Sequence, residues 1–251
     1  MTASRSTWLT RAGERVLDLL FPPSCVACRS ELAELPDKVG MCVSCREQLE
    51  LVAWPVCHRC AARVPEIPGE VSQCGHCRDM KLWFDRAITM GNYDGLLRDL
   101  LIRMKTDRSE LLARALAHLA AEQLGAQLAD SRFDVVTSVP MHAWRRLSRG
   151  TNPPAAVASH LGGLLGIPAW LGLLQRRRNT QPQRGLSRPG RFQNIRGELQ
   201  LRKSYILEAA HVLLVDDILT TGATCSESAK VLKRAGADQV TVLVMARTPI
   251  G

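Results

Sequence analysis

The chain has 251 residues, 46% of them hydrophobic and 23% charged, a balance that is typical of a core-forming globular protein and excludes global disorder. No apolar run approaches the roughly 20 residues that a membrane-spanning helix needs, and charged side chains interrupt the apolar stretch before residue 21, so we expect a cytoplasmic protein without membrane insertion. The formal net charge is +9, and residues 176–203, with nine basic side chains and one acidic, contribute +8 of it. Such a local basic strip indicates a phosphate-rich partner, although a solvated loop could have the same composition.

Residues 1–80 contain a helix candidate and then eight of the nine cysteines, in four Cys-x-x-Cys pairs. Adding 32 to the number of each of the first four cysteines gives the number of one of the second four, so the spacing C-x2-C-x13-C-x2-C is duplicated. Two such turns close a tetrahedral four-thiolate site with no open position, which predicts two structural zinc ions in a small double zinc-ribbon-like module. The expected ligands are Cys25, Cys28, Cys42, Cys45, Cys57, Cys60, Cys74 and Cys77.

Two alternatives to this zinc assignment remain open. Sequential pairing of the first four and the second four cysteines fits the duplication best, but a cross-braced arrangement would leave the same spacing. A disulfide scaffold would need an export signal, and none is visible in the sequence.

From residue 81 to residue 251 short β-rich runs alternate with longer amphipathic stretches. Strands are expected at 86–91, 134–139, 211–215 and 239–246, and helices at 96–104, 110–128, 154–165 and 223–234. This alternation predicts an α/β domain with a parallel, doubly wound sheet and helices on both faces. Residues 175–196 are rich in Asn, Gln, Pro and Gly, a composition that resists regular structure and predicts a mobile loop.

The strongest motif of this half begins where the apolar strand 211–215 runs into Asp216 and Asp217. A hydroxyl-rich turn follows and opens a helix, and ligands of open α/β sheets sit beyond the carboxyl ends of the strands. Amides, hydroxyls and the helix N-terminus converge there into a cradle for one phosphate, made of Thr220, Thr221, Gly222, Ala223 and Thr224. The two carboxylates suit ribose hydroxyls or hydrated Mg²⁺, and the alternative is that they merely cap the helix.

This motif resembles the signature of type I phosphoribosyltransferases. The resemblance implies that Asp216 and Asp217 contact the 2′- and 3′-hydroxyls of phosphoribosyl pyrophosphate, bound with Mg²⁺, and that residues 220–224 hold its 5′-phosphate. With the cysteine pairs and the segments at residues 20–25, 93–95, 138–142 and 194–197, the whole chain is similar to the ComF family of competence and DNA-utilisation proteins. It departs from that family's pattern at Ser138, where proline is usual, and at residues 151–153.

The family is associated with uptake of single-stranded DNA, which implies single-stranded DNA and helicase or channel proteins as partners. Two functions stay open: binding of DNA or a phosphoribosyl pyrophosphate-type ligand, and an active phosphoribosyltransferase that joins a base or amine to C1′ with loss of pyrophosphate. The sequence identifies no base pocket and no general acid or base. Guanidinium groups suit phosphates, and the candidates for pyrophosphate or DNA phosphate are Arg145, Arg146, Arg149, Arg176, Arg177 and Arg178.

Overall fold

A computed structural model of the chain describes residues 22–32, 39–49, 51–52, 54–65, 74–78, 80–141, 152–177, 185–202 and 205–249. The chain divides into two compact units, Met1–Gln48 and Leu49–Gly251. The second cysteine group therefore lies in the same unit as the α/β half, while the domain boundary expected after residue 80 stays a prediction. The helix expected before the cysteines lies outside the described residues.

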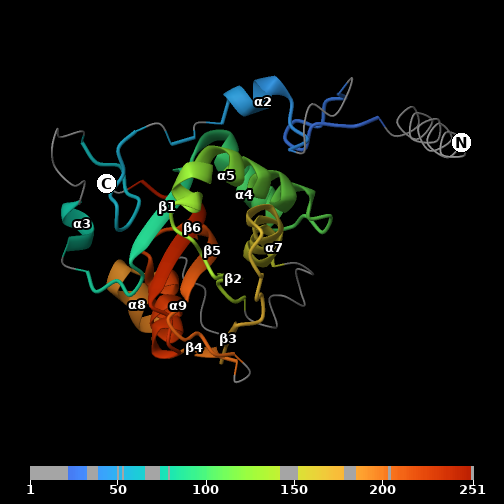
Figure 1. Cartoon of the computed structure of the whole chain (residues 1–251). Helices are drawn as coiled ribbons and strands as arrows, with labels where there is room; N and C mark the ends of the chain where they lie inside the picture. Colours follow the sequence, from blue (N-terminus) through green and yellow to red (C-terminus); the bar gives the residue numbers. More distant parts are fainter. Residues whose placement is uncertain are drawn as a thin grey trace, which may run out of the picture. The chain divides into compact units, whose positions relative to one another are not determined.

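The larger unit is built on a four-stranded parallel sheet in the order β1-β6-β5-β2 (Figure 1). Its strands are β1 (Arg86–Asn92), β2 (Val135–Ser138), β5 (His211–Leu219) and β6 (Gln239–Arg247). The expected strand at 211–215 continues to Leu219 because β6 pairs with it as far as the Leu219–Arg247 register position. On its other side β2 ends at Ser138, opposite Val215. Residues 216–219 thus extend past β2 at the carboxyl edge of the sheet.

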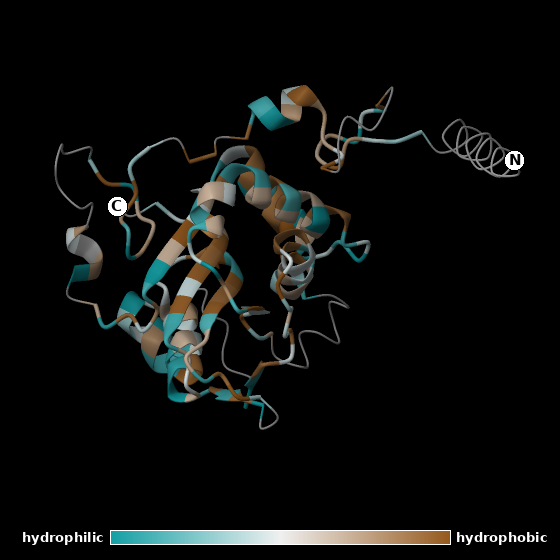
Figure 2. Cartoon of the chain, viewed as in Figure 1, coloured by the Kyte–Doolittle hydropathy of each residue, from teal (hydrophilic) through white to brown (hydrophobic). Residues whose placement is uncertain are grey.

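Helices cover both faces of this sheet, as the sequence predicts. On β5 the side chains of Val212 and Leu214 belong to one apolar cluster with α9 (Ala223–Arg234), and the alternating Leu213 and Val215 are also 0% exposed. Figure 1 places α9 on one side and the other three long helices on the other. These three are α4 (Gly95–Met104), α5 (Leu111–Ala129) and α7 (Pro153–Leu165). Burial on two faces explains why the strands are mostly hydrophobic along their length (Figure 2).

The segment 175–196 is more regular than its composition predicts. It contains the last two residues of β3 (Leu174–Arg176), which pairs antiparallel with β4 (Leu199–Leu201), and the whole of α8 (Arg188–Ile195). The Ser187 hydroxyl caps α8 by accepting a hydrogen bond from the Gly190 amide, and Pro189 occupies the first turn, where it costs no hydrogen bond. The expectation of an irregular loop is therefore wrong for residues 188–195, and residues 178–184 lie outside the described part.

In the part of the chain that the structure describes, no helix is both long and apolar enough to cross a membrane.

Candidate metal centres and a phosphate-binding turn

The duplication seen in the cysteine spacing is also a duplication of backbone geometry. In the first copy the Cys25 amide donates to the Ser30 carbonyl at 2.9 Å, and 32 residues later the Cys57 amide donates to the Ala62 carbonyl at 2.7 Å. Between them, Arg29 and Ala61 occupy equivalent left-handed positions with φ of 66° and 54°. The first two cysteines of each copy therefore lie on a turn of the same conformation.

The second turn of each copy is tied to the first by a hydrogen bond to sulfur. The Cys42 amide donates to Cys25 Sγ at 3.3 Å, and the Cys74 amide donates to Cys57 Sγ at 3.4 Å. A short helix follows in both copies, α2 (Val43–Glu47) and α3 (Gly75–Arg78), whose bounds begin 32 residues apart. An amide that points at a sulfur stabilises the thiolate form that metals bind.

The sulfur atoms gather sequentially into two groups, Cys25/Cys28/Cys42/Cys45 and Cys57/Cys60/Cys74/Cys77, in each of which all four atoms lie within 4.8 Å of one another. A tetrahedral site with zinc–sulfur bonds of about 2.3 Å has sulfur–sulfur distances of about 3.8 Å. The Sγ–Sγ distances are close to this value, at 3.4 Å between Cys60 and Cys74 and 3.9 Å between Cys28 and Cys42. Burial and neighbouring sulfurs raise the pKa of Cys60 to about 11, so four thiolates need a cation to coexist there. Both groups fit structural zinc, and the sequential pairing is the one observed.

The phosphate-binding turn, which we define as residues 220–224, connects β5 to α9 at the carboxyl edge of the sheet. Gly222 has φ of 80°, a left-handed conformation that glycine adopts without strain, and it serves as the N-cap of α9 without a side chain to cap the first amides. The Ala223 amide donates a hydrogen bond to the Thr221 hydroxyl oxygen at 3.4 Å. The N-terminus of a twelve-residue helix, whose dipole favours an anion, thus lies at this edge.

The two aspartates before this turn have different surroundings. Burial, and then the adjacent Asp217 carboxylate, raise the pKa of Asp216 from 3.8 to about 7, while the Asp217 amide, the Cys225 thiol and Arg176 act in the opposite direction. Asp217 forms an ion pair with Lys105, with 3.1 Å between Nζ and Oδ2. Near neutral pH, Asp216 therefore exchanges a proton readily, whereas Asp217 holds a cationic neighbour. Cys225 donates to Asp216 Oδ2 at 3.4 Å and is buried at 1% exposure.

The structure brings one of the predicted arginines to this edge. Arg176 Nε donates to the Pro140 carbonyl at 2.9 Å, in the segment that follows β2, and its charge reaches Asp216. Arg177 is exposed and uses its backbone amide to pair with Glu198. The remaining candidates lie outside the described residues, namely Arg145, Arg146, Arg149 and Arg178. Ser138, at the end of β2, has a buried hydroxyl without a hydrogen-bond partner among the described residues. A buried hydroxyl of this kind is one that a bound ligand or water can satisfy.

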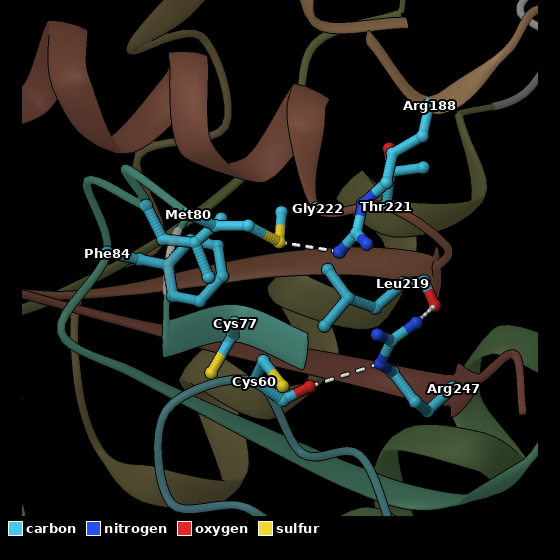
Figure 3. Close-up of a pocket in the computed structure, with 10 residues that line it drawn as sticks. Cys60, Cys77, Met80, Phe84, Arg188, Leu219, Thr221, Gly222 and Arg247 are labelled. Carbon is cyan, nitrogen blue, oxygen red and sulfur yellow. Dashed lines mark hydrogen bonds between the residues drawn. The ribbon is translucent and has the colours of Figure 1, made fainter. Parts of the chain in front are cut away.

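Two basic residues of this region were missed by the sequence analysis. Lys105 directly follows α4, and its position after an expected helix is the one sequence signal that could have pointed to it. Arg247 ends β6, and a charged residue after an apolar strand is the signal that could have identified it. Arg247 lines a small pocket with Thr221, Gly222 and residues of the second cysteine group, and Figure 3 shows its guanidinium directed toward the carbonyls around it.

Comparisons with known proteins agree with both halves of this description. The family described as "Double zinc ribbon domain" matches residues 16–78, and "Phosphoribosyl transferase domain" matches residues 108–251. The chain is 30% identical over 168 residues to "Competence protein F" of Haemophilus influenzae, covering 65% of this chain and 73% of that protein. It is 30% identical over 172 residues to "DNA utilization protein YhgH" of Escherichia coli (strain K12), covering 66% and 73%. Among solved structures, orotate phosphoribosyltransferase from Aeropyrum pernix is 22% identical, with a TM-score of 0.35 and coverage of 58% and 64%.

Proposed function

Since this chain belongs to the ComF family of competence and DNA utilization proteins and contains a phosphoribosyl transferase domain, we propose that it binds a phosphoribosyl pyrophosphate-type ligand and acts on incoming single-stranded DNA in the cytoplasm. One observation carries the ligand part. Two carboxylates stand on the protruding end of β5 and lead directly into a left-handed glycine and a helix N-terminus. Acceptors for hydroxyls and donors for a phosphate thus lie within one short segment.

The residues divide the ligand chemistry between them. The turn at residues 220–224 offers backbone amides, threonine hydroxyls and the positive end of the α9 dipole to a 5′-phosphate. Asp216 and Asp217 accept hydrogen bonds from the ribose hydroxyls, and the Lys105 ammonium, 3.1 Å from Asp217 Oδ2, lies beside that acceptor. When Mg²⁺ is bound, its oxygen ligands hold it where its positive charge offsets the negative charge of the pyrophosphate. Arg176, which donates to the Pro140 carbonyl and whose charge reaches Asp216, adds a cation at this edge.

The DNA part of the proposal is supported by the basic strip and by the names of the relatives. Residues 176–203 hold nine basic side chains and one acidic, and the relatives are named for competence and DNA utilization. Guanidiniums bind backbone phosphates without regard to sequence, which suits a protein that handles any incoming strand. Helicase or channel proteins of DNA uptake are the partners that this role calls for.

The ligand is tested by thermal unfolding of the full zinc-loaded chain with phosphoribosyl pyrophosphate and Mg²⁺. At about 100 times the dissociation constant, binding stabilises the fold by about 2.7 kcal/mol, which raises the melting temperature by roughly 5–10 °C. The double variant Asp216→Asn and Asp217→Asn should lose this rise, because its site lacks the carboxyl groups that accept from the ribose hydroxyls and bind the metal. Asp99→Asn, an exposed aspartate on α4, is the matched control and should keep it. An undiminished rise in the double variant would remove these aspartates from the site.

The DNA part is tested by the salt dependence of single-strand binding. Each phosphate contact contributes about 0.7 to the slope of log affinity against log salt, so replacing Arg176, Arg177 and Arg178 by Ala should flatten the slope by about two units. The exposed pair Arg98→Ala and Arg114→Ala is the control away from the strip. An unchanged slope would place the DNA elsewhere, and absence of binding at low salt would favour the phosphoribosyltransferase alternative.

A further inference from the structure

Arg247 connects the second cysteine group to the phosphate-binding turn through one buried guanidinium. The residue is 4% exposed at the end of β6. Its Nε donates to the Cys60 carbonyl at 3.1 Å, and its Nη1 donates to the Leu219 carbonyl at 2.8 Å and to the Thr220 carbonyl. Figure 3 shows this guanidinium between the cysteine-bearing loop and the end of β5. Arg247 and Cys60 are 187 positions apart in the chain.

The charge of Arg247 calls for compensation that the second cysteine group can supply. A buried cation is costly unless hydrogen bonds and an opposite charge surround it. The guanidinium donates to backbone carbonyls and to the Thr248 hydroxyl, which are neutral groups. A zinc ion with four thiolates carries a net charge of −2, and one of those sulfurs belongs to Cys60 itself.

The segment between the second cysteine group and β1 lies against the same turn. A Cβ on Gly222 would stand 3.6 Å from both Leu82 and Phe84. Arg59, inside the first Cys-x-x-Cys of this group, donates to the Leu82 carbonyl at 3.1 Å. The Trp83 amide donates to the Ser226 hydroxyl on α9 at 3.1 Å. The cysteine group thus contacts the turn directly through Arg247 and indirectly through residues 82–84.

We propose that Arg247 is a positioning residue through which zinc in the second cysteine group fixes the geometry of the phosphate-binding turn. The metal holds the loop that carries the Cys60 carbonyl, this carbonyl and the carbonyls of Leu219 and Thr220 orient a single guanidinium, and the guanidinium fixes the start of the turn. Partners beyond the metal ligands commonly tune metal binding, so the coupling acts on the zinc as well. That the turn holds a phosphate rests on the proposed function, whereas the coupling itself does not.

The test compares Arg247→Gln with Arg59→Gln in the full zinc-loaded chain. Both variants remove a guanidinium that donates to a carbonyl in or near the second cysteine group, but of the two only Arg247 donates to a carbonyl of the turn itself, that of Thr220. Hydrogen–deuterium exchange over residues 216–224 should become about tenfold faster in Arg247→Gln and stay near the unmodified rate in Arg59→Gln. One of the two zinc equivalents should pass to a chromogenic chelator about tenfold faster in Arg247→Gln, the low end of the effect of partners beyond the metal ligands.

A second variant keeps the test decisive if Arg247→Gln does not fold by circular dichroism. Arg247→Lys retains the charge, but one ammonium cannot match the fork that joins three carbonyls, so the same two changes are expected at smaller size. Exchange and zinc release that match the unmodified protein in a folded Arg247 variant would overturn the proposal. Because neither readout uses phosphoribosyl pyrophosphate or DNA, loss of ligand binding with the coupling intact would count against the proposed function alone.

Discussion

The two cysteine groups have the same local geometry and different surroundings. Hydrogen bonds repeat with an offset of 32 residues, down to the amide that points at the first sulfur of each group. The first group lies in the unit Met1–Gln48, where Cys28 is exposed. In the second, Cys57, Cys60 and Cys77 are buried in one apolar cluster with residues of β5, β6 and α9. The geometry of the zinc ligands is thus set within each copy, whereas the effect of metal loss on stability depends on which residues pack against that copy.

The largest expected effect comes from breaking one group at a time. Cys42→Ser and Cys74→Ser alter equivalent positions, and each should release about one of two zinc equivalents. Structural zinc contributes about 10–16 kcal/mol in small metal-bound modules, and a whole domain is stable by only about 5–15 kcal/mol. Cys74→Ser should therefore lower the main melting transition by more than about 10 °C, because the second group belongs to the core of the larger unit.

In contrast, Cys42→Ser should leave that main transition within about 2 °C and destabilise only the smaller unit. Calorimetry combined with metal analysis distinguishes the two variants. Equal shifts of the main transition would show that both groups support the sheet to the same extent.

An effect of intermediate size is expected in the pH dependence of stability, which should differ between the two units because the larger one contains Asp216. Its pKa of about 7 lies above the usual 3.8, so between those values the folded chain keeps a proton that the unfolded chain has lost. The stability contributed by this group is present at low pH, falls by at most about 1.4 kcal/mol per pH unit as the pH rises to about 7, and then levels off.

Urea unfolding at pH 5.5, 6.5 and 7.5 measures this slope, and Asp216→Asn should abolish the Asp216 part of it. Zinc binding depends on pH in both proteins, so it cancels when the variant is compared with the unmodified chain. Parallel pH profiles would mean that Asp216 titrates normally.

The smallest effect concerns the left-handed residues of the two first turns. Arg29→Gly and Ala61→Gly relieve equivalent backbone strain, which costs roughly 1–2 kcal/mol for a residue with a Cβ, and part of the gain is lost to the greater freedom of glycine in the unfolded chain. We expect a net gain of about 0.5 kcal/mol from each. For Ala61→Gly the gain should appear in the main unfolding transition, and for Arg29→Gly in the smaller unit only. A loss of stability in both would mean that the turns are not strained.

The features that the sequence predicted well are those that depend on near neighbours in the chain. The cysteine turns have fixed spacing, and α9 was predicted with the bounds that it has, because an apolar strand, a glycine turn and an amphipathic run mark its start. The end of β5 was missed, since strand length depends on the partner β6. α8 was missed because the Gly, Pro and Asn content was weighed above the capping residue Ser187.

What the sequence could not predict is contact between distant residues. Lys105 meets Asp217, and Arg247 meets Cys60, across more than a hundred positions of the chain in each case, and no local pattern records such a pairing. For the same reason the spacing predicts two equal cysteine groups and cannot indicate that the second shares its apolar cluster with β5 and α9. The roles predicted for the aspartates, the turn and the arginines stay predictions.

The position of β6 has a consequence for how this protein is made. β6 lies between β1 and β5, yet it follows both of them in the chain, so a ribosome delivers it after every other strand of the sheet. Until then β1 and β5 have exposed backbone edges on the sides where β6 will lie, which is the kind of surface that draws nascent chains into aggregates. The cysteines of the second group emerge long before Arg247, so zinc can organise that loop early. Its connection to the turn can form only later, once Arg247 has been synthesised.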